Sequence, residues 1–274
     1  MTQHVYRYKN STISYYRFGI GKELMVTFHG YNQTGEEYRY FEEELGKRFT
    51  VIAIDFFWHG ASTWQEQHDF RDSDMKDIVS GIAHQEQLTQ YRFSVCSFSM
   101  GARLARALVR NFASRIDYFI LLSPPTFAFN TFLNFTTNNP LGLAIFRHFV
   151  KTPGSLQSWV ERLKKWGVLN RSVYIFTSKF VGKQERIEKV FKTWYAQRKL
   201  QTNFKTFAQL LNQHNIKVVL IVGEKDHITP PAKMIDYIKK LSRHEVYILQ
   251  KKHELATPET KAVFKQLFDE TIHK

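Results

Sequence analysis

Short apolar runs alternate along this chain with longer segments in which apolar residues recur every three or four positions. The runs have the length and composition of buried strands, and the longer segments have the periodicity of amphipathic helices. Strands are predicted at residues 5–8, 12–18, 24–28, 49–55, 91–97, 116–122, 216–222 and 246–249, of which the first two form a hairpin. Helices are predicted at residues 36–47, 74–88, 100–112, 231–241 and 258–272.

This order of elements predicts an α/β fold. Continuous apolar strands separated by amphipathic helices form a mostly parallel sheet with helices on both faces. Ligands of such proteins bind at the carboxyl ends of the strands. The loops that directly follow the predicted strands are therefore where functional side chains are expected.

Residues 126–212 break this pattern. They are rich in aromatic side chains and contain 14 Lys and Arg but only 3 Asp and Glu, in a chain of formal net charge +14. So sharp a change predicts a separate unit inserted into an α/β core formed by residues 1–125 and 213–274. Its charge attracts anions, so an anionic small-molecule substrate is expected. Such charge more often covers a solvated outer face than a binding site. A membrane surface is a further alternative, but no other feature of the sequence supports it.

Composition excludes several other classes of protein. With 43% hydrophobic residues the chain is not intrinsically disordered, and a single cysteine rules out a disulfide framework. Basic and aromatic residues occur together in nucleic-acid-binding proteins, but no zinc, Gly-rich or helix-turn-helix motif accompanies them here, so nucleic acid is not expected. The first residues lack the pattern of a signal peptide and no apolar run reaches the ~18 residues of a membrane helix, so we expect a cytoplasmic location.

The strongest candidate for chemistry is Ser97-Phe98-Ser99-Met100-Gly101, between a predicted strand and a predicted helix. Small residues two positions before and after a serine allow the sharp turn of a nucleophile elbow, which lifts the hydroxyl above the sheet. Glycine is commoner than serine at the first of these positions. Taken alone, the motif also fits an ordinary turn in which Ser99 caps the helix.

Further segments in the same order give the chain a resemblance to the α/β-hydrolase superfamily. Phe28-His29-Gly30-Tyr31 is similar to the His-Gly turn after the third strand of that fold. Residues 55–62 resemble its Asp-x-x-x-x-Gly-x-Ser loop, residues 223–230 the loop with the triad acid, and residues 252–254 the loop with the triad histidine. The resemblance covers nearly the whole chain outside residues 126–212, and it implies that this middle segment is a helical cap.

The resemblance also implies a catalytic triad of Ser99, His253 and Asp226. A serine hydroxyl is a weak nucleophile until a base takes its proton, and the acid fixes the tautomer of that base. Glu224 is the competing candidate for the acid. Some members of the family carry the acid after the strand that here ends at Leu122, but in this chain that strand is followed by Ser-Pro-Pro, which contains no acidic residue. The oxyanion hole would be the backbone N–H groups of Tyr31 and Met100.

Other residues receive lesser roles. The candidate substrate-binding residues are His29, Gly30, Phe98 and Phe127. His29 and His59 are interpreted mainly as residues that support the loops of the site, and Asp55 as a structural acceptor. The histidines show no metal-ligand spacing, and no Gly-rich phosphate loop follows the first strand, so neither a metal nor a cofactor is expected.

These observations predict a cofactor-independent serine hydrolase acting on a small acyl substrate, either a carboxylic ester or the C–C bond of a β-diketone acid. Two alternatives stay open. The elbow and its helix also resemble the menaquinone-pathway synthase that eliminates pyruvate, a lyase that binds anionic groups with arginines, and Arg103 lies on this helix. The other alternative is a non-catalytic member of the fold that binds a ligand or a polyanion.

Overall fold

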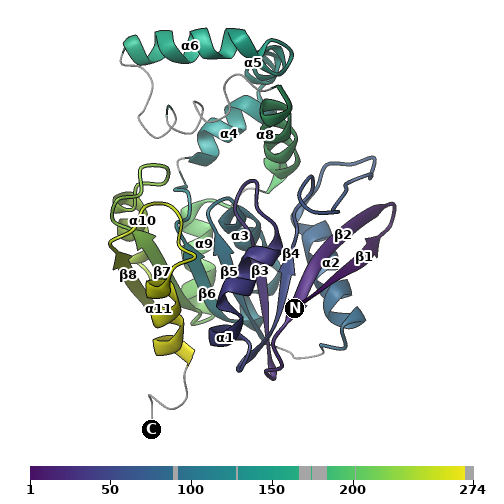
Figure 1. Ribbon diagram of the computed structural model, residues 1–274, viewed down its shortest axis with the longest axis vertical. Coiled ribbons are helices and arrows are strands. Elements are labelled where there is room, and N and C mark those ends of the chain that lie inside the picture. Colours follow the sequence, from purple (N-terminus) through teal and green to yellow (C-terminus); the bar gives the residue numbers. More distant parts are fainter. Residues whose placement is uncertain (89–91, 128, 167–173, 175–183, 201, 269–274) are drawn as a thin grey trace.

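The computed structural model describes residues 1–88, 92–127, 129–166, 174, 184–200 and 202–268. Within these ranges a single sheet of eight strands forms the centre of the molecule, in the order β1-β2-β4-β3-β5-β6-β7-β8 (Figure 1). β1 pairs with β2, and β2 with β4, in antiparallel fashion, and the other neighbours are parallel. The strands are β1 (Thr2–Tyr8), β2 (Ser11–Phe18), β3 (Glu23–Phe28), β4 (Phe49–Ile54), β5 (Phe93–Phe98), β6 (Ile116–Leu122), β7 (Lys217–Gly223) and β8 (His244–Leu249).

Burial explains the continuous apolar runs in the sequence. Every residue of β4 and of β5 is buried, because helices cover both faces of the parallel part of the sheet. β1 lies at the edge, and its residues are mostly exposed or half-buried. The predicted α/β architecture, with a mostly parallel sheet between two helical layers, is therefore confirmed.

Each face of the sheet has its own hydrophobic core. One core is covered by α2 (Asp72–Gln85), α3 (Gly101–Phe112) and α10 (Ala232–Ile238). The other is covered by a 3₁₀ helix, η1 (Gly35–Phe41), by α1 (Glu42–Leu45) and by α11 (Pro258–Phe268). A short 3₁₀ turn, η2 (Ala113–Arg115), leads from α3 into β6.

One predicted helix differs in type. The segment expected as a helix over residues 36–47 begins as the 3₁₀ helix η1 and ends as the single turn α1. The buried residues of η1 are Gly35, Tyr38 and Phe41, a spacing of three that matches the three residues per turn of a 3₁₀ helix. The Tyr38 hydroxyl donates to Phe28 O over 3.0 Å, which anchors this helix to the end of β3.

Helices form a layer above the carboxyl ends of the strands (Figure 1). These are α4 (Phe129–Asn138), α5 (Pro140–Lys151), α6 (Pro153–Lys165), α8 (Gln184–Ala196) and the 3₁₀ turn η3 (Gln197–Lys199). α5 and α6 each start with proline, which fits the first turn of a helix because its missing N–H has no partner there. We call this layer the cap.

The last helix of the segment predicted as a cap, α9 (Phe204–Gln213), lies on the core instead (Figure 1). Its Phe207 and Leu211 are four residues apart, fully buried, and belong to the same core as α3. The Phe207 ring lies 5.4 Å from that of Phe119 in β6. The structure thus places the return to the core before α9, ahead of the boundary at residues 212 and 213 that composition suggests, because this apolar face covers the sheet.

In the described ranges, none of the helices combines the length and the apolar character that crossing a lipid bilayer demands.

Candidate active site

Ser99 lies at a sharp turn between β5 and α3. Its backbone is left-handed, with a φ of 47°, a conformation that L-residues rarely adopt. The Ser99 N–H donates to Leu122 O at the end of β6 over 2.8 Å and so holds the turn in place. This backbone has the features of a nucleophile elbow, in which strain at the serine exposes the hydroxyl above the sheet.

Small residues on either side allow this turn. A Cβ atom on Gly101 would lie 2.3 Å from Phe28 O, so only glycine lets α3 begin this close to the end of β3. Ser97 stands where glycine is commoner, and it is fully buried. Its hydroxyl donates to Ile120 O over 3.4 Å, which explains how a serine is accommodated at this position.

The structure brings Ser99, His253 and Asp226 together from loops after three different strands. His253 Nε2 lies 2.9 Å from Ser99 Oγ, and His253 Nδ1 lies 2.8 Å from Asp226 Oδ2. Because an ionised carboxylate can only accept hydrogen bonds, His253 Nδ1 carries a proton and donates a hydrogen bond to Asp226. Nε2 is then the acceptor that faces the Ser99 hydroxyl, as general-base catalysis requires.

The Asp226 carboxylate accepts hydrogen bonds from its own loop and from His253. Its Oδ1 accepts from the N–H groups of Ile228 and Thr229 over 2.8 and 2.9 Å. Its Oδ2 accepts from the Thr229 hydroxyl over 2.7 Å as well as from His253. Burial raises the pKa of Asp226, but the hydrogen bond and charge of His253 and the Thr229 bonds outweigh it, so the pKa lies below 3.8.

Glu224, the competing candidate for the acid, points elsewhere. It is exposed, and its carboxylate accepts a hydrogen bond from the side chain of Gln250. Of the two acids, Asp226 is the one that hydrogen-bonds His253.

The two residues expected to form the oxyanion hole follow adjacent strands. β3 and β5 pair in parallel, with Phe28 opposite Ser97. Tyr31 follows the end of β3 and Met100 follows Ser99, so both turns meet at the same edge of the sheet. Tyr31 also contacts the cap, since its hydroxyl donates to Arg186 O over 3.4 Å.

His29 and His59 join the loops after β3 and β4 in a reciprocal way. His29 Nε2 accepts from the Phe56 N–H over 3.0 Å, and His59 Nε2 accepts from the Asn32 N–H over 3.1 Å. Each Nδ1 donates to a nearby carbonyl, Gly30 O at 2.7 Å and Phe57 O at 3.1 Å. Both rings are 2% exposed and use both nitrogen atoms, so they hold the loops and offer nothing further to a ligand.

These histidines predict a specific pH dependence of stability. Burial, with a smaller contribution from the charge of Lys189, lowers the pKa of His29 to about 4, and burial with the charges of His29 and Lys189 lowers that of His59 to about 3. Unfolded histidine titrates near 6.5, so between pH 6.5 and about 4 the unfolded state binds more protons. We expect the free energy of unfolding to fall with decreasing pH there, by about 1.4 kcal/mol per pH unit for each histidine.

The measurement is urea denaturation at several pH values. His29→Gln should be less stable overall, but its loss of stability per pH unit should be smaller than that of the wild type by about 1.4 kcal/mol. His84→Gln, at an exposed position of α2, serves as the control and should keep the wild-type slope. A wild-type slope in His29→Gln would show that the folded protein does not keep this ring neutral.

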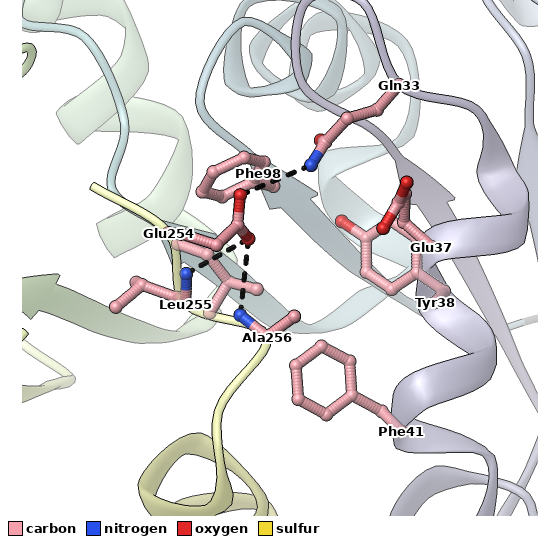
Figure 2. A pocket seen from close by; sticks show the side chains of 9 residues that line it. Gln33, Glu37, Tyr38, Phe41, Phe98, Glu254, Leu255 and Ala256 are labelled. Atoms are coloured by element: carbon pink, nitrogen blue, oxygen red, sulfur yellow. Dashed lines mark hydrogen bonds between the residues drawn. The ribbon is translucent and has the colours of Figure 1, made fainter. Parts of the chain in front are cut away.

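Gly30 packs on Phe98, and Phe98 lies beside His253. A Cβ atom on Gly30 would lie 2.7 Å from the Phe98 ring, so glycine lets the turn after β3 pack on this ring. The Phe98 ring lies 5.2 Å from that of His253. Phe98 also lines a pocket whose other walls come from η1 and from the loop after His253 (Figure 2).

Gln33 connects the loop after β3 with the loop that carries His253 across this pocket. Its Oε1 accepts from the Gly30 N–H over 2.9 Å. Its Nε2 donates to Glu254 Oε2 at 3.5 Å, and Figure 2 shows this second bond. Glu254 in turn accepts from the N–H groups of Leu255 and Ala256. Gln33 thereby fixes the turn that precedes Tyr31 relative to the loop that carries His253.

Phe127 and Arg103 lie in well-packed surroundings. The Phe127 ring is 8% exposed and packs against the rings of Phe204, Phe207 and Tyr237, with the Arg106 guanidinium 4.2 Å from its centre. Arg103 is buried on α3, and its Nη2 donates to Gln197 O over 2.9 Å. It therefore links the helix after the elbow to the base of the cap.

Two residues of the site escaped sequence reasoning. Thr229 belongs to the predicted acid loop, and a threonine three residues after an aspartate is a recurrent turn signal that could have indicated its bond to Asp226. Gln33 carries no such signal, because its partners lie three and 221 residues away along the chain.

In the described ranges, no group of three or more His, Cys, Asp or Glu side chains is placed to hold a metal ion.

A family model described as alpha/beta hydrolase fold matches residues 23–256 of the chain. The chain therefore belongs to the alpha/beta hydrolase family, and the fold and the family together define it as an enzyme of the α/β-hydrolase type. A search of curated protein sequences finds no match to it.

Several solved structures are similar to this chain over nearly its whole length. A thermophilic esterase from Thermogutta terrifontis is 16% identical, with a TM-score of 0.65, covering 100% of this chain and 99% of the esterase. A meta-cleavage product hydrolase from Pseudomonas fluorescens IP01 is 14% identical, with a TM-score of 0.60 and coverage of 96% and 95%. The haloalkane dehalogenase DbeA from Bradyrhizobium elkani USDA94 is 17% identical, with a TM-score of 0.61 and coverage of 97% and 96%. At these identities the similarity establishes the fold alone.

Proposed function

We propose that this protein is a cofactor-independent serine hydrolase that cleaves a small acyl substrate, a carboxylic ester or the C–C bond of a β-diketone acid. The observation that carries the proposal is the continuous hydrogen-bond chain from Ser99 through His253 to Asp226. The strained backbone of Ser99 supports the same role, because it presents the hydroxyl at the edge of the sheet where substrates bind.

In the proposed reaction, His253 Nε2 takes the proton of Ser99 as Oγ attacks the carbonyl carbon of the substrate. The N–H groups of Tyr31 and Met100 stabilise the negative oxygen of the tetrahedral intermediate. The intermediate collapses to an acyl-serine, and the imidazolium returns its proton to the leaving group. Water then attacks the acyl-serine, gives its proton to His253, and the acid product leaves as the proton returns to Ser99.

Asp226 assists both halves of this cycle. As a carboxylate that accepts from His253 Nδ1, it holds the ring with Nε2 toward Ser99 and stabilises the imidazolium that forms in each step. The lowered pKa of Asp226 keeps this group ionised throughout the neutral pH range.

Within this proposal, Gly30 and Phe98 flank the acyl group. His29 supports the turn that carries Tyr31, and Phe127 supports α3 from the core side. Direct contact of His29 or Phe127 with the substrate, which the sequence suggests, is not part of the proposal, because both side chains are buried among protein partners.

An active-site-directed fluorophosphonate tests the proposal. The probe phosphonylates a serine only when a base activates it, so intact protein should gain the mass of one probe group, and peptide mapping should find it on Ser99. Ser99→Ala and His253→Ala should stay unlabelled. Absence of labelling in the folded wild type would contradict the proposal and favour the non-catalytic alternative. Labelling without release of p-nitrophenol from any ester would favour the lyase alternative, in which the triad serves as a base.

A further inference from the structure

The face of α8 that points toward the core carries a row of polar residues. Lys189, Thr193 and Gln197 follow one another at intervals of four, so they lie on one side of the helix and of the turn η3 that continues it. We call them the α8 row. At about 1.5 Å per residue, the row is about 12 Å long.

Each end of the α8 row contacts an element of the proposed active site. The Lys189 ammonium donates to Asn32 Oδ1 over 3.0 Å, and Asn32 directly follows Tyr31 in the loop after β3. At the other end, Arg103 Nη2 donates to Gln197 O over 2.9 Å, and Arg103 lies on α3, four residues after Ser99. The row therefore runs along the cap from the predicted oxyanion loop to the helix of the nucleophile elbow.

Two of the three side chains are buried and carry a polar atom with no partner in the described part of the chain. Thr193 is 0% exposed and Gln197 is 1% exposed. Neither Thr193 Oγ1 nor Gln197 Nε2 finds a hydrogen-bond partner among the described residues. Buried polar groups are nearly always satisfied, and a helical threonine commonly bonds the carbonyl four residues before it. Both groups therefore have hydrogen-bonding capacity that the described residues do not use.

Lys189 is a cation that has no neighbouring anion in the part of the chain that the structure describes. Among the described residues no carboxylate lies within 4.0 Å of its ammonium, whereas Lys192, on the same helix, forms a 2.7 Å ion pair with Glu188. Cap residues 167–173 and 175–183, which lie outside the description, contain no Asp or Glu. Burial lowers the pKa of Lys189, and its charge contributes to the lowered pKa of His29 and of His59.

Most of the remaining cap charge faces solvent. The side chains of Lys151, Arg162, Lys164 and Lys165 on α5 and α6 are exposed. These helices lie farther from the sheet than α8 does (Figure 1). Lys189 is thus distinguished from the exposed cap cations by its contact with the loop after β3.

We propose that the α8 row binds a carboxylate of the substrate, so that this enzyme acts on acyl compounds with a free carboxylate remote from the bond that is cleaved. The assignment of the scissile bond to Ser99 rests on the proposed function above. A carboxylate carries one negative charge and accepts several hydrogen bonds, which suits the Lys189 ammonium and the Thr193 hydroxyl four residues further along the row. The Gln197 amide N–H group lies one turn beyond and is available to another polar group of the substrate. The ligand would then satisfy the polar groups that the folded chain leaves unpaired.

Paired esters of equal length test this inference. Mono-p-nitrophenyl adipate carries a free carboxylate, and its methyl ester is the neutral counterpart. We expect the wild type to have a higher kcat/KM for the charged ester than for the neutral one. Lys189→Met should lower the ratio of these two kcat/KM values about tenfold or more. Lys192→Met, at an exposed and ion-paired position, is the matched control and should keep the wild-type ratio. An equal loss on both esters in Lys189→Met would overturn the proposal and assign Lys189 to support of the loop.

Thr193→Val adds a readout that separates binding from packing. Valine has nearly the shape of threonine, and the Thr193 hydroxyl forms no bond that the variant would lose, so Tm should not fall. The ratio of charged to neutral kcat/KM should nevertheless fall about threefold or more. A lower Tm with an unchanged ratio would contradict the proposal, because the hydroxyl would then serve the fold.

A binding measurement keeps this inference separate from the proposed function. Ser99→Ala should bind monomethyl adipate at least about tenfold more tightly than dimethyl adipate by titration calorimetry, and the additional change Lys189→Met should remove the difference. Equal affinities for the two compounds would overturn the carboxylate site even if Ser99 proves to be the nucleophile. Selective binding of monomethyl adipate without fluorophosphonate labelling would instead support the carboxylate site and contradict the proposed hydrolase.

Discussion

Replacement of Ser99 by alanine is expected to lower kcat for a short p-nitrophenyl ester by about 10⁴-fold or more. Alanine removes the oxygen that attacks the carbonyl and leaves His253 and the oxyanion donors without a nucleophile to assist. Alanine also keeps a Cβ atom at a left-handed position, so the fold should be retained, which circular dichroism and Tm would verify. Initial rates with p-nitrophenyl acetate or butyrate measure the effect.

The matched control is Ser97→Ala, because the elbow contains two serines. Ser97 lies within β5, and its hydroxyl forms one bond of 3.4 Å to Ile120 O. Its removal should leave kcat within a few-fold of the wild type. If Ser99→Ala retained wild-type turnover while Ser97→Ala lost it, Ser99 would not be the nucleophile. The hydrogen bond from Ser99 to His253 would then not serve to activate a nucleophile.

Replacement of Asp226 by asparagine should also be severe, with a loss in kcat of about 10³- to 10⁴-fold. An amide at this position no longer offers a negative charge to the imidazolium, and its NH₂ group can stabilise the tautomer with Nε2 protonated. In that tautomer Nε2 has no lone pair to accept the Ser99 proton. The Ser99–His253 distance can stay near 2.9 Å, so the loss would come from protonation state and charge rather than from misplacement.

Glu224→Gln is the control for Asp226→Asn. The Glu224 carboxylate is exposed and hydrogen-bonded to Gln250, so its neutralisation should leave kcat nearly unchanged. Steady-state rates for both variants, measured at the same pH on one ester, decide the question. Comparable losses in the two variants would speak against a dedicated triad acid, and a loss confined to Glu224→Gln would transfer the role to that residue.

The α8 row adds a criterion for the choice of substrate in all these experiments. The cap of this chain is strongly basic, but exposed lysines and arginines on α5 and α6 act only through a long-range field that salt screens within about 8–10 Å. Lys189 is half-buried against the loop after β3, and buried charges are screened much less. A preference for carboxylate-bearing esters that persists at high salt would therefore point to the row rather than to the general charge of the cap.

Much of the fold followed from local patterns along the chain. Apolar runs predicted β3, β4, β5, β6 and β7 to within about two residues at their ends, because strands buried on both faces need continuous hydrophobic residues. The same order of motifs identified the family and proposed Ser99, Asp226 and His253. Such motifs are readable because the elbow and the turns after parallel strands depend on residues that are neighbours in sequence.

Contacts between distant segments decided what the sequence left open. The sequence favours Asp226 over Glu224, which is two residues away and chemically alike, and the structure shows that Asp226 is the one that hydrogen-bonds His253, 27 residues further along the chain. His29 became a support rather than a ligand contact because Phe56 and Gly30 occupy both its nitrogen atoms. α9 joined the core because Phe207 packs on β6, although its composition continues that of the cap.

The α8 row shows the same division most clearly. The sequence by itself determined that the middle of the chain is basic and aromatic, which follows from composition, and the resemblance to the family implied that it is helical. Only the tertiary structure decided which of its cations faces the loop after β3, since Lys189 contacts Asn32, 157 residues away along the chain. Side-chain charge is a property of each residue, but burial and partnership arise when distant segments pack together, and these two properties separate a binding site from a solvated surface.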